Sequence, residues 1–382
     1  MKMSTSSSTK MDTKRQRPFH CSFLSTMVLF SGAFFIWSAF FFTDHKERFS
    51  AWKLTYARQT ARCNNCETLF SPDHEIKALP RGIVSKTSDL LMQPLWGPRN
   101  KKNPKRSTNL LAMAVGIKQK ESVNKIVQKF LSSNFVVMLF HYDGIVNDWR
   151  EFEWSDRAIH VSATSQTKWW FAKRFLHPDI VSDYAYIFLW DEDLGVEHFN
   201  VDRYLSIIKE EGLQISQPAL DLNKSTEVHH PLTARDSKQR VHRKVHTVIG
   251  RRKCDENSTE PPCTGWVEMM APVFSTASWR CAWHLIQNDL IHAWGLDFQL
   301  GYCAQGDRTK NIGIVDSEYI IHYGLPTLGA SDAKKAQAES QQSDARSEVR
   351  KLSFIELEIF KNRWKKAVKD DENWFDPYEK KQ

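Results

Sequence analysis

The chain has 382 residues, of which 41% are hydrophobic, including 14 Trp and 23 Phe. This composition is ample for a packed core, and it excludes a chain that is disordered throughout. The formal net charge of +8 and the pI near 9.0 are compatible with nucleic acid, anionic lipid, or a polyanionic or nucleotide-linked substrate.

The amino-terminal region predicts a membrane anchor. Residues 1–20 form a polar, basic tail, and residues 21–43 then carry no charge and are rich in Phe, Leu and Ala. A helix needs about 20 apolar residues to cross a bilayer. A cleaved signal peptide is the competing interpretation, but the apolar stretch is too long, and its end too bulky, for one. We expect an uncleaved transmembrane anchor at residues 21–43.

Several features place the part after the anchor in the secretory lumen. Basic residues precede the span only slightly more often than they follow it, so charge asymmetry alone is a weak guide. Asn223 and Asn257 begin glycosylation sequons, and six of the seven cysteines follow the anchor. Together these features predict a single-pass type II protein. A Phe-rich span of this length fits the thinner Golgi membrane, with the endoplasmic reticulum as the alternative.

Residues 44–106 have the composition of a stem. They mix polar residues with five prolines and end in a basic run from Arg99 to Arg106. In a cytosolic protein that run is a candidate nuclear signal, whereas behind an anchor a solvated linker is the better interpretation. We therefore expect the folded domain to begin near residue 107.

From residue 107 to residue 330, apolar runs typical of strands alternate with segments of helical pattern. The predicted strands cover residues 110–116, 135–140, 158–162, 185–190 and 214–219. The predicted helices cover residues 121–131, 167–182 and 201–211. Such alternation predicts an α/β fold, with a mixed, mostly parallel sheet flanked by helices.

The regular alternation breaks after Asp221, where residues 223–253 are polar and basic. The later predicted elements are a strand at 265–275, a helix at 276–289, and apolar strands at 312–315 and 319–324. Residues 331–350 are polar and predict a flexible linker. The segment 351–382 contains an amphipathic helix rich in Lys and Arg, which we expect to pack on the domain instead of on a membrane.

A pair of carboxylates follows the apolar run at 185–190. That run predicts a strand buried on both faces, and Asp191 and Asp193 follow its carboxyl end, where open α/β sheets bind ligands. An Asp-x-Asp pair in that place suits a divalent cation that also holds phosphate oxygens. His322, at the end of a later apolar strand, can complete the metal shell as a neutral imidazole. The plainer alternatives are a solvated turn for the acidic triplet and a structural role for the histidine.

Two further carboxyl groups are candidates for a general base. Asp297 follows the turn Trp294-Gly295, in which glycine lets the backbone approach a ligand and tryptophan offers a flat face for a sugar ring. The Asp297 carboxylate can deprotonate an acceptor hydroxyl, and a helix cap or turn aspartate is the equal alternative. Glu268, on the strand predicted at 265–275, is the second candidate.

Other charged residues are candidates for contacts with a nucleotide. Lys168 and Arg174 precede the Asp-x-Asp strand on a predicted helix and can neutralise a diphosphate, although such residues more often lie on a solvated face. Asp143 follows the second predicted strand and is a candidate contact for a ribose or a base edge. The basic block from Arg235 to Lys253 is either a loop that meets a leaving phosphate or an acidic glycan, or a solvated loop.

The cysteines suggest two disulfides. Cys254 and Cys263 flank a Pro-Pro loop, and Cys281 can pair with Cys303, although sequence alone does not prove a pairing. The Cys-x-x-Cys of the stem lacks a second pair at zinc-ligand spacing. The chain contains no Gly-x-Gly-x-x-Gly, no P-loop and no Gly-x-Ser-x-Gly, so kinase, hydrolase and dehydrogenase interpretations have no motif behind them.

Several phrases of the sequence resemble a plant protein family called domain of unknown function 707. The likeness runs from about residue 80 to about residue 370. The phrases that carry it are Leu111-Ala-Met-Ala-Val-Gly-Ile-Lys-Gln-Lys, His141-Tyr-Asp-Gly, Lys168-Trp-Trp-Phe-Ala-Lys-Arg-Phe, Tyr186-Ile-Phe-Leu-Trp-Asp-Glu-Asp-Leu-Gly and Trp266-Val-Glu-Met-Met-Ala-Pro-Val-Phe.

Members of this family often carry the name lysine-ketoglutarate reductase trans-splicing related, which suggests work on RNA. This chain has no RNA-binding signature, and the predicted anchor separates its basic regions from nuclear RNA. We therefore expect no nucleic acid partner and treat the name as inherited.

At the level of fold, the domain is similar to the GT-A type of glycosyltransferase. This resemblance implies an Asp-x-Asp that binds Mn²⁺ (or Mg²⁺) and the diphosphate of a nucleotide-sugar, which Asp191 and Asp193 match. It also implies a late histidine ligand, matched by His322, and an acidic base on the acceptor side, best matched by Asp297. No nucleotide-sugar or acceptor signature is present, so the functional expectation depends partly on analogy of fold.

The expected function is metal-dependent transfer of a sugar in the Golgi lumen, from a nucleotide-sugar to a glycan or cell-wall acceptor, with inversion at the transferred sugar. The rival from another class is a catalytically silent membrane protein that holds acidic polysaccharide with its tryptophans and basic loop. An RNA-processing factor is the third alternative. The sequence determines neither the donor, the acceptor nor the oligomeric state.

Overall fold

The structure is a computed structural model, and it describes residues 78–83, 108–226, 228, 231–245, 248–249, 252–255, 257–325, 338–376 and 378. All of these belong to one contact unit that spans residues 72–382. The predicted tail and anchor, and nearly all of the predicted stem, lie outside the described residues. Within the described part of the chain, no helix is both long enough and apolar enough to cross a membrane.

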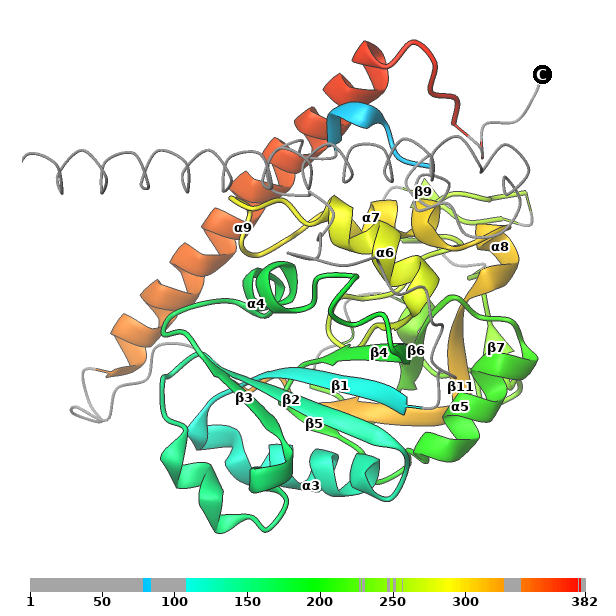
Figure 1. The fold of residues 1–382 in the computed structure, drawn as a ribbon. Helices are drawn as coiled ribbons and strands as arrows, with labels where there is room; N and C mark the ends of the chain where they lie inside the picture. Colours follow the sequence, from blue (N-terminus) through cyan, green and yellow to red (C-terminus); the bar gives the residue numbers. More distant parts are fainter. Residues whose placement is uncertain are drawn as a thin grey trace, which may run out of the picture. The chain divides into compact units, whose positions relative to one another are not determined.

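A nine-stranded mixed sheet lies at the centre of the described residues (Figure 1). Its strand order is β3-β2-β1-β4-β10-β6-β11-β5, and β7 also pairs with β11. The strands are β1 (Thr108–Val115), β2 (Phe135–His141), β3 (Ile159–Ser162), β4 (Tyr184–Trp190), β5 (Leu194–Gly195), β6 (Ile215–Leu220), β7 (Val241–His242), β10 (Val273–Ser275) and β11 (Ile312–His322). A separate hairpin joins β8 (Val248–Ile249) to β9 (Arg252–Lys253).

Parallel pairs make up the longest ladders of this sheet. The pairs β3–β2, β2–β1, β1–β4 and β6–β11 are parallel. Strand β10 runs antiparallel between β4 and β6, and β5 and β7 are antiparallel to β11. The carboxyl ends of β1, β4 and β11 are therefore brought to one region, where the polar residues that follow them can meet.

Helices cover both faces of the sheet (Figure 1). On one face lie α3 (Lys120–Leu131) and α5 (Val201–Glu210), and on the other lie α4 (Lys168–Phe175), α6 (Thr276–Leu285), α7 (Leu296–Gln299) and α9 (Ala338–Asp370). The short helix α8 (Arg308–Asn311) leads into β11. The 3-10 turns are η1 (Arg81–Ile83), η2 (Ile117–Gln119), η3 (Asn147–Glu151), η4 (Ser155–Arg157), η5 (Pro231–Thr233) and η6 (Leu300–Cys303).

The sheet separates two hydrophobic cores because successive side chains of a strand point to opposite faces. In β1, Leu110 and Ala112 belong to the core that includes α4, α6 and α9, whereas Leu111 and Met113 belong to the core of α3 and α5. Both faces are covered, which explains why these strands read as continuous apolar runs in the sequence. A mixed α/β domain with a large sheet between helices is thus confirmed.

Several predicted boundaries differ from the structure. The strand predicted at 265–275 is formed only over β10, since the chain turns at Gly265 with a φ of +65°, and Glu268 lies in the loop before the strand. The apolar segments at 312–315 and 319–324 belong to one strand, β11, whose register shifts between Val315 and Tyr319. Helix α9 begins at Ala338, so the segment predicted as a flexible linker is helical from that residue onward.

Helix α9 packs on the domain through ion pairs and close contacts. Arg363 forms a bidentate pair with Asp289, at 2.7 and 2.6 Å between nitrogen and oxygen. A Cβ on Gly82 of η1 would lie 3.1 Å from Cβ of Ala367, so η1 and α9 touch directly. Tertiary packing of this kind stabilises a helix whose own sequence is polar over its first turns.

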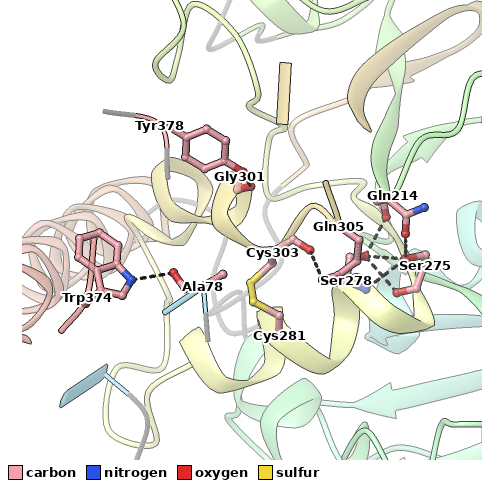
Figure 2. The surroundings of a disulfide bond; sticks show 10 residues. All are labelled: Ala78, Gln214, Ser275, Ser278, Cys281, Gly301, Cys303, Gln305, Trp374 and Tyr378. Carbon is pink, nitrogen blue, oxygen red and sulfur yellow. Dashed lines mark hydrogen bonds between the residues drawn. A yellow bond between two sulfur atoms is a disulfide. The ribbon is translucent and has the colours of Figure 1, made fainter. Parts of the chain in front are cut away.

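Two disulfides join segments near the sheet. Cys281 of α6 is bonded to Cys303 of η6, as Figure 2 shows, and Cys254 is bonded to Cys263. These are the two pairs that the sequence suggested. In the same region, the indole nitrogen of Trp374 donates a hydrogen bond of 3.0 Å to the carbonyl of Ala78 (Figure 2), which ties the end of the chain to the segment before η1.

A buried ion pair holds β7 on β11. Asp316 is fully buried, and its Oδ2 lies 2.7 Å from Nδ1 of His242, while Nε2 of His242 lies 2.5 Å from the carbonyl oxygen of Leu232. Burial alone would lower the pKa of His242, but the hydrogen bond and the negative charge of Asp316 outweigh burial and raise the pKa.

The charge of His242 makes a pH-dependent contribution to stability. Because the folded pKa is raised, this contribution is complete below about pH 6.5, the ordinary value, and is lost as the pH rises through the folded pKa. We expect His242→Gln to lower the free energy of unfolding by about 2 kcal/mol at low pH and by less at high pH. Urea unfolding at several pH values measures this, with the exposed His198→Gln as the control. An equal loss at every pH would contradict the prediction.

Candidate functional site

A cavity of about 810 Å³ opens where β1, β4 and β11 end. Three of its walls are the acidic triplet after β4, the end of β11 and the start of α4. The others are the loop 266–270, the segment 292–298 and residues 349–357 of α9. Of the residues singled out in the sequence, the cavity is lined by Lys168, Asp191, Asp193, Glu268, Asp297 and His322. The carboxyl ends of the strands thus collect most of the candidates.

Asp191 is paired with a buried lysine. Nζ of Lys168 lies 2.6 Å from Oδ1 of Asp191 and also donates hydrogen bonds to the carbonyls of Met269 (2.7 Å) and Met270 (3.3 Å). The Lys168 side chain is only 8% exposed, so its ammonium group is held by three acceptors and is not on a solvated helix face. Desolvation raises the pKa of Asp191, and the positive charge of Lys168 opposes that rise.

Asp193 lies beside His322 because of the backbone pairing between β5 and β11. His322 is the register partner of Leu194, the residue after Asp193. Oδ2 of Asp193 lies 3.5 Å from Nε2 of His322 and accepts a hydrogen bond of 2.9 Å from the backbone N–H of Leu325. Both side chains are largely buried at the wall of the cavity.

The three predicted metal ligands do not come together as one cluster. Asp193 and His322 are adjacent, while Asp191 is engaged by Lys168. In the part of the chain that the structure describes, no group of three or more His, Cys, Asp and Glu side chains is placed to hold a metal ion. A carboxylate and an imidazole are donors that suit Mn²⁺ or Mg²⁺, so the residues present supply a pair of protein ligands and leave further positions for other donors.

The central residue of the acidic triplet has a different role. Oε2 of Glu192 accepts a hydrogen bond of 2.7 Å from the N–H of Gly116, and Oε1 accepts one of 2.5 Å from the hydroxyl of Tyr142. Glu192 is buried, and burial raises its pKa to about 8, although both hydrogen bonds oppose the rise. The side chain therefore ties the end of β4 to the ends of β1 and β2.

Glu268 and Asp297 bring two carboxyl groups of raised pKa to the cavity. Burial raises the pKa of Glu268 to about 7 and that of Asp297 to about 6. Thr233 hydrogen-bonds to Glu268, and the charges of His322, Asp297 and Asp191 act on it, so Glu268 lies among these three residues. Asp297 is the second residue of α7, and its carboxyl accepts hydrogen bonds from the indole of Trp266 and from backbone N–H groups of this turn, which oppose the rise in its pKa.

Asp143 and Arg174 lie outside the group that lines the cavity. The carboxylate of Asp143 accepts hydrogen bonds from the N–H groups of Ile117 (2.7 Å) and Ile145 (2.9 Å), so it stabilises the turn after β2. Arg174 is exposed and lies over the ring of Trp170, 4.1 Å from its centroid. Neither residue is placed by this structure to contact a ligand in the cavity.

The described part of the basic block is paired with the domain. The guanidinium nitrogen Nη2 of Arg240 lies 2.5 Å from Oε2 of Glu210, and Nη2 of Arg243 lies 2.9 Å from Oε2 of Glu211. Arg235 stacks 3.7 Å from the ring centroid of Tyr319. These contacts fit a loop fastened to the surface.

The two predicted glycosylation acceptors are accessible. Asn223 lies in the turn after β6 and Asn257 in the loop between the two cysteines of the first disulfide, and both are exposed.

Sequence analysis missed three contributions to the cavity. Tyr142 lines it and holds Glu192, and its presence in the phrase His-Tyr-Asp-Gly was the only sign of a role. Thr167 caps α4 by accepting a hydrogen bond from Trp170 N–H and lines the cavity beside Lys168. Helix α9 supplies a wall through residues 349–357, for which the local sequence carries no signal.

Residues 71–370 match the family model described as protein of unknown function DUF707, and the chain belongs to that family. The resemblance found in the sequence is thereby confirmed. No curated protein matches the chain.

Three solved structures are similar to the chain over part of its length. TarS of S. aureus (residues 1–349) gives a TM-score of 0.37 and 8% identity, covering 56% of this chain and 60% of that chain. The mannosyltransferase Ktr4p of S. cerevisiae gives a TM-score of 0.23 and 9% identity, covering 41% of this chain and 52% of that chain. The glycosyltransferase GlyE of Streptococcus pneumoniae gives a TM-score of 0.32 and 10% identity, covering 69% of this chain and 64% of that chain. This chain thus spans between half and two thirds of each protein, and no TM-score reaches 0.5, so the proposal below depends on the cavity itself.

The role of Glu192 can be tested by its removal. Glu192→Ala leaves the N–H of Gly116 and the hydroxyl of Tyr142 without their acceptor, and we expect a loss of about 1–3 kcal/mol for each buried group. Thermal or urea unfolding measures the loss, and Glu153→Ala, at an exposed carboxylate, is the control. A Glu192→Ala protein as stable as the wild type would show that these hydrogen bonds do not hold the strand ends together.

Proposed function

We propose that this protein is a glycosyltransferase that uses a nucleotide-sugar and a divalent cation, Mn²⁺ or Mg²⁺. One observation carries the proposal: a single cavity at the ends of β1, β4 and β11 contains a buried ammonium, an Asp–His pair and two carboxyls of raised pKa. Transfer from a nucleoside diphosphate needs positive charge for the leaving group and a base for the acceptor. Both kinds of group line this cavity.

The donor side of the proposed site is the acidic triplet. Asp193 and His322 are the residues that would hold the cation, and phosphate oxygens of the donor are the hard ligands that would complete its shell. When bound, the cation supplies positive charge to the diphosphate. Lys168 keeps Asp191 in place at the same wall through their ion pair.

The acceptor side of the proposed site is the start of α7. Asp297 is the proposed general base, because it lies in α7 on the cavity wall and burial raises its pKa to about 6. Such a pKa leaves the carboxylate ionised at neutral pH and still basic enough to take a proton from a hydroxyl. Glu268, nearer the acidic triplet, is the second candidate, and we propose inversion as the stereochemical outcome.

The proposed setting is the lumen of the Golgi, in a single-pass type II protein with a glycan or cell-wall acceptor. The uncharged stretch at 21–43, the exposed sequons at Asn223 and Asn257, and the two disulfides support this setting.

Nucleotide affinity tests the donor side. We expect the full chain to bind UDP or GDP more tightly with Mn²⁺ than without it, because Asp193 and His322 need the cation to attract a diphosphate. Asp193→Asn should weaken binding at least about tenfold with Mn²⁺ and change it little without Mn²⁺. Isothermal titration calorimetry measures both affinities.

The control for this titration is Asp202→Asn, which removes an exposed carboxylate from the first turn of α5. Its affinity should equal that of the wild type. If neither nucleotide binds the wild type, or if Asp193→Asn binds as the wild type does with Mn²⁺, the proposed function is wrong.

The pH dependence of transfer tests the base. A carboxylate base works only when ionised, so kcat/KM should fall as the pH drops through about 6, the pKa of Asp297. Asp297→Asn should lower kcat at least about a hundredfold while nucleotide affinity is kept. Release of the nucleoside diphosphate, in a screen of donor sugars, gives the rates. If Glu268→Gln removes activity and Asp297→Asn does not, Glu268 is the base instead.

A further inference from the structure

Two large aromatic side chains remain exposed at one wall of the cavity. Trp294 is 39% exposed and Phe354 is 56% exposed, and both line the cavity that contains Asp297. Their ring centroids lie 5.0 Å apart, with an angle of 75° between the ring planes. Trp294 comes from the loop before α7, and Phe354 comes from α9. Exposed apolar surface of this kind, beside a polar cavity, is typical of a place where a ligand binds.

The backbone around Trp294 has an uncommon conformation. Ala293 has a φ of +59° and Gly295 a φ of +98°, so both neighbours of Trp294 lie in the left-handed region. Residues with a Cβ rarely adopt that region unless the surrounding structure imposes it, and such positions concentrate at functional sites. The φ of +98° favours glycine at position 295, and a Cβ there would lie 2.7 Å from Cδ1 of Leu357, so the loop lies directly against α9.

Hydrogen bonds lock this loop to α9. The backbone N–H of His292 donates to Oε2 of Glu356 (2.8 Å), and Nδ1 of His292 lies 3.0 Å from Oε1 of the same residue. Glu356 is buried. Glu356 and Phe354 belong to the same part of α9, so these contacts hold the loop of Trp294 against the part of the helix that carries Phe354.

The chemistry of this wall fits a sugar ring. A pyranose presents C–H groups on its faces and hydroxyls around its edge, so it needs a flat aromatic surface next to hydrogen-bonding groups. The side chain amide of Gln166 and the carboxyl of Asp297 line the same cavity and are groups of this kind. Nδ1 of His292 and the hydroxyl of Ser353 are already engaged by Glu356 and by the carbonyl of Val349.

We propose that Trp294 and Phe354 form a platform for a pyranose ring of the acceptor glycan, in which the pyranose stacks on the face of one aromatic ring while the other ring, at 75° to the first, borders it. Helix α9 supplies one of the two rings. The inference rests on the proposed function, because it places the acceptor next to Asp297. It assigns to the C-terminal helix a part in substrate binding that neither the family description nor the sequence pattern suggests.

Binding of defined oligosaccharides tests the platform. The full chain, in a detergent without a sugar headgroup, is titrated with hexasaccharides of β-1,4-linked glucose, xylose or mannose, in the presence of UDP or GDP and Mn²⁺. We expect the wild type to bind at least one of them, and Trp294→Ala and Phe354→Ala each to weaken that binding at least about tenfold. Trp294→Phe, which keeps an aromatic face, should restore much of the affinity.

Controls separate this proposal from the proposed function. Ile355→Ala removes an exposed apolar side chain from the next position of α9, outside this cavity, and should bind the oligosaccharide as the wild type does. Trp294→Ala and Phe354→Ala should both keep the nucleotide affinity and the melting temperature of the wild type. If the wild type binds nucleotide but no hexasaccharide, or if the alanine variants bind the oligosaccharide normally, the platform is refuted and the proposed function stands. Loss of nucleotide binding by the wild type would instead refute the proposed function.

Discussion

The short antiparallel pairing of β5 with the end of β11 determines the geometry of the whole site. It turns the chain back directly after the acidic triplet and sets Leu194 opposite His322, which places Asp193 against the imidazole. Without this pairing, Asp193 would have no imidazole beside it. Glu192 adds a second tie, from the end of β4 to Gly116 and Tyr142.

Charge inside the cavity is balanced locally. Lys168 is surrounded by Asp191 and two carbonyls, so that the only buried ammonium of the wall has all of its hydrogen-bond acceptors from the protein. Glu268 and Asp297, in contrast, have no cation beside them, and burial raises the pKa of both although hydrogen bonds from Thr233 and Trp266 oppose the rise.

Helix α9 links stability to the site. Its later part is fastened to Asp289 and to η1, and its middle holds the loop of His292 through Glu356. Its earlier described side chains then form a wall of the cavity, next to Trp294. The amphipathic pattern at 354–368 predicted a helix that packs on the domain, but a pattern of one helix cannot say which loop it meets, and the polar sequence before it gave no sign of continued helix.

Short-range patterns of apolar residues predicted the α/β alternation and the acidic residues after β4, and the positions of the cysteines suggested the two disulfide pairs that the structure contains. Tertiary structure alone decided that Lys168 pairs with Asp191, that Asp143 and Arg174 lie outside the cavity, and that Glu268 sits in a loop near His322. These outcomes depend on which strand ends and loops meet in space. A local sequence pattern cannot predict them, because the hydrogen bonds and the burial involved join residues that are far apart in the chain.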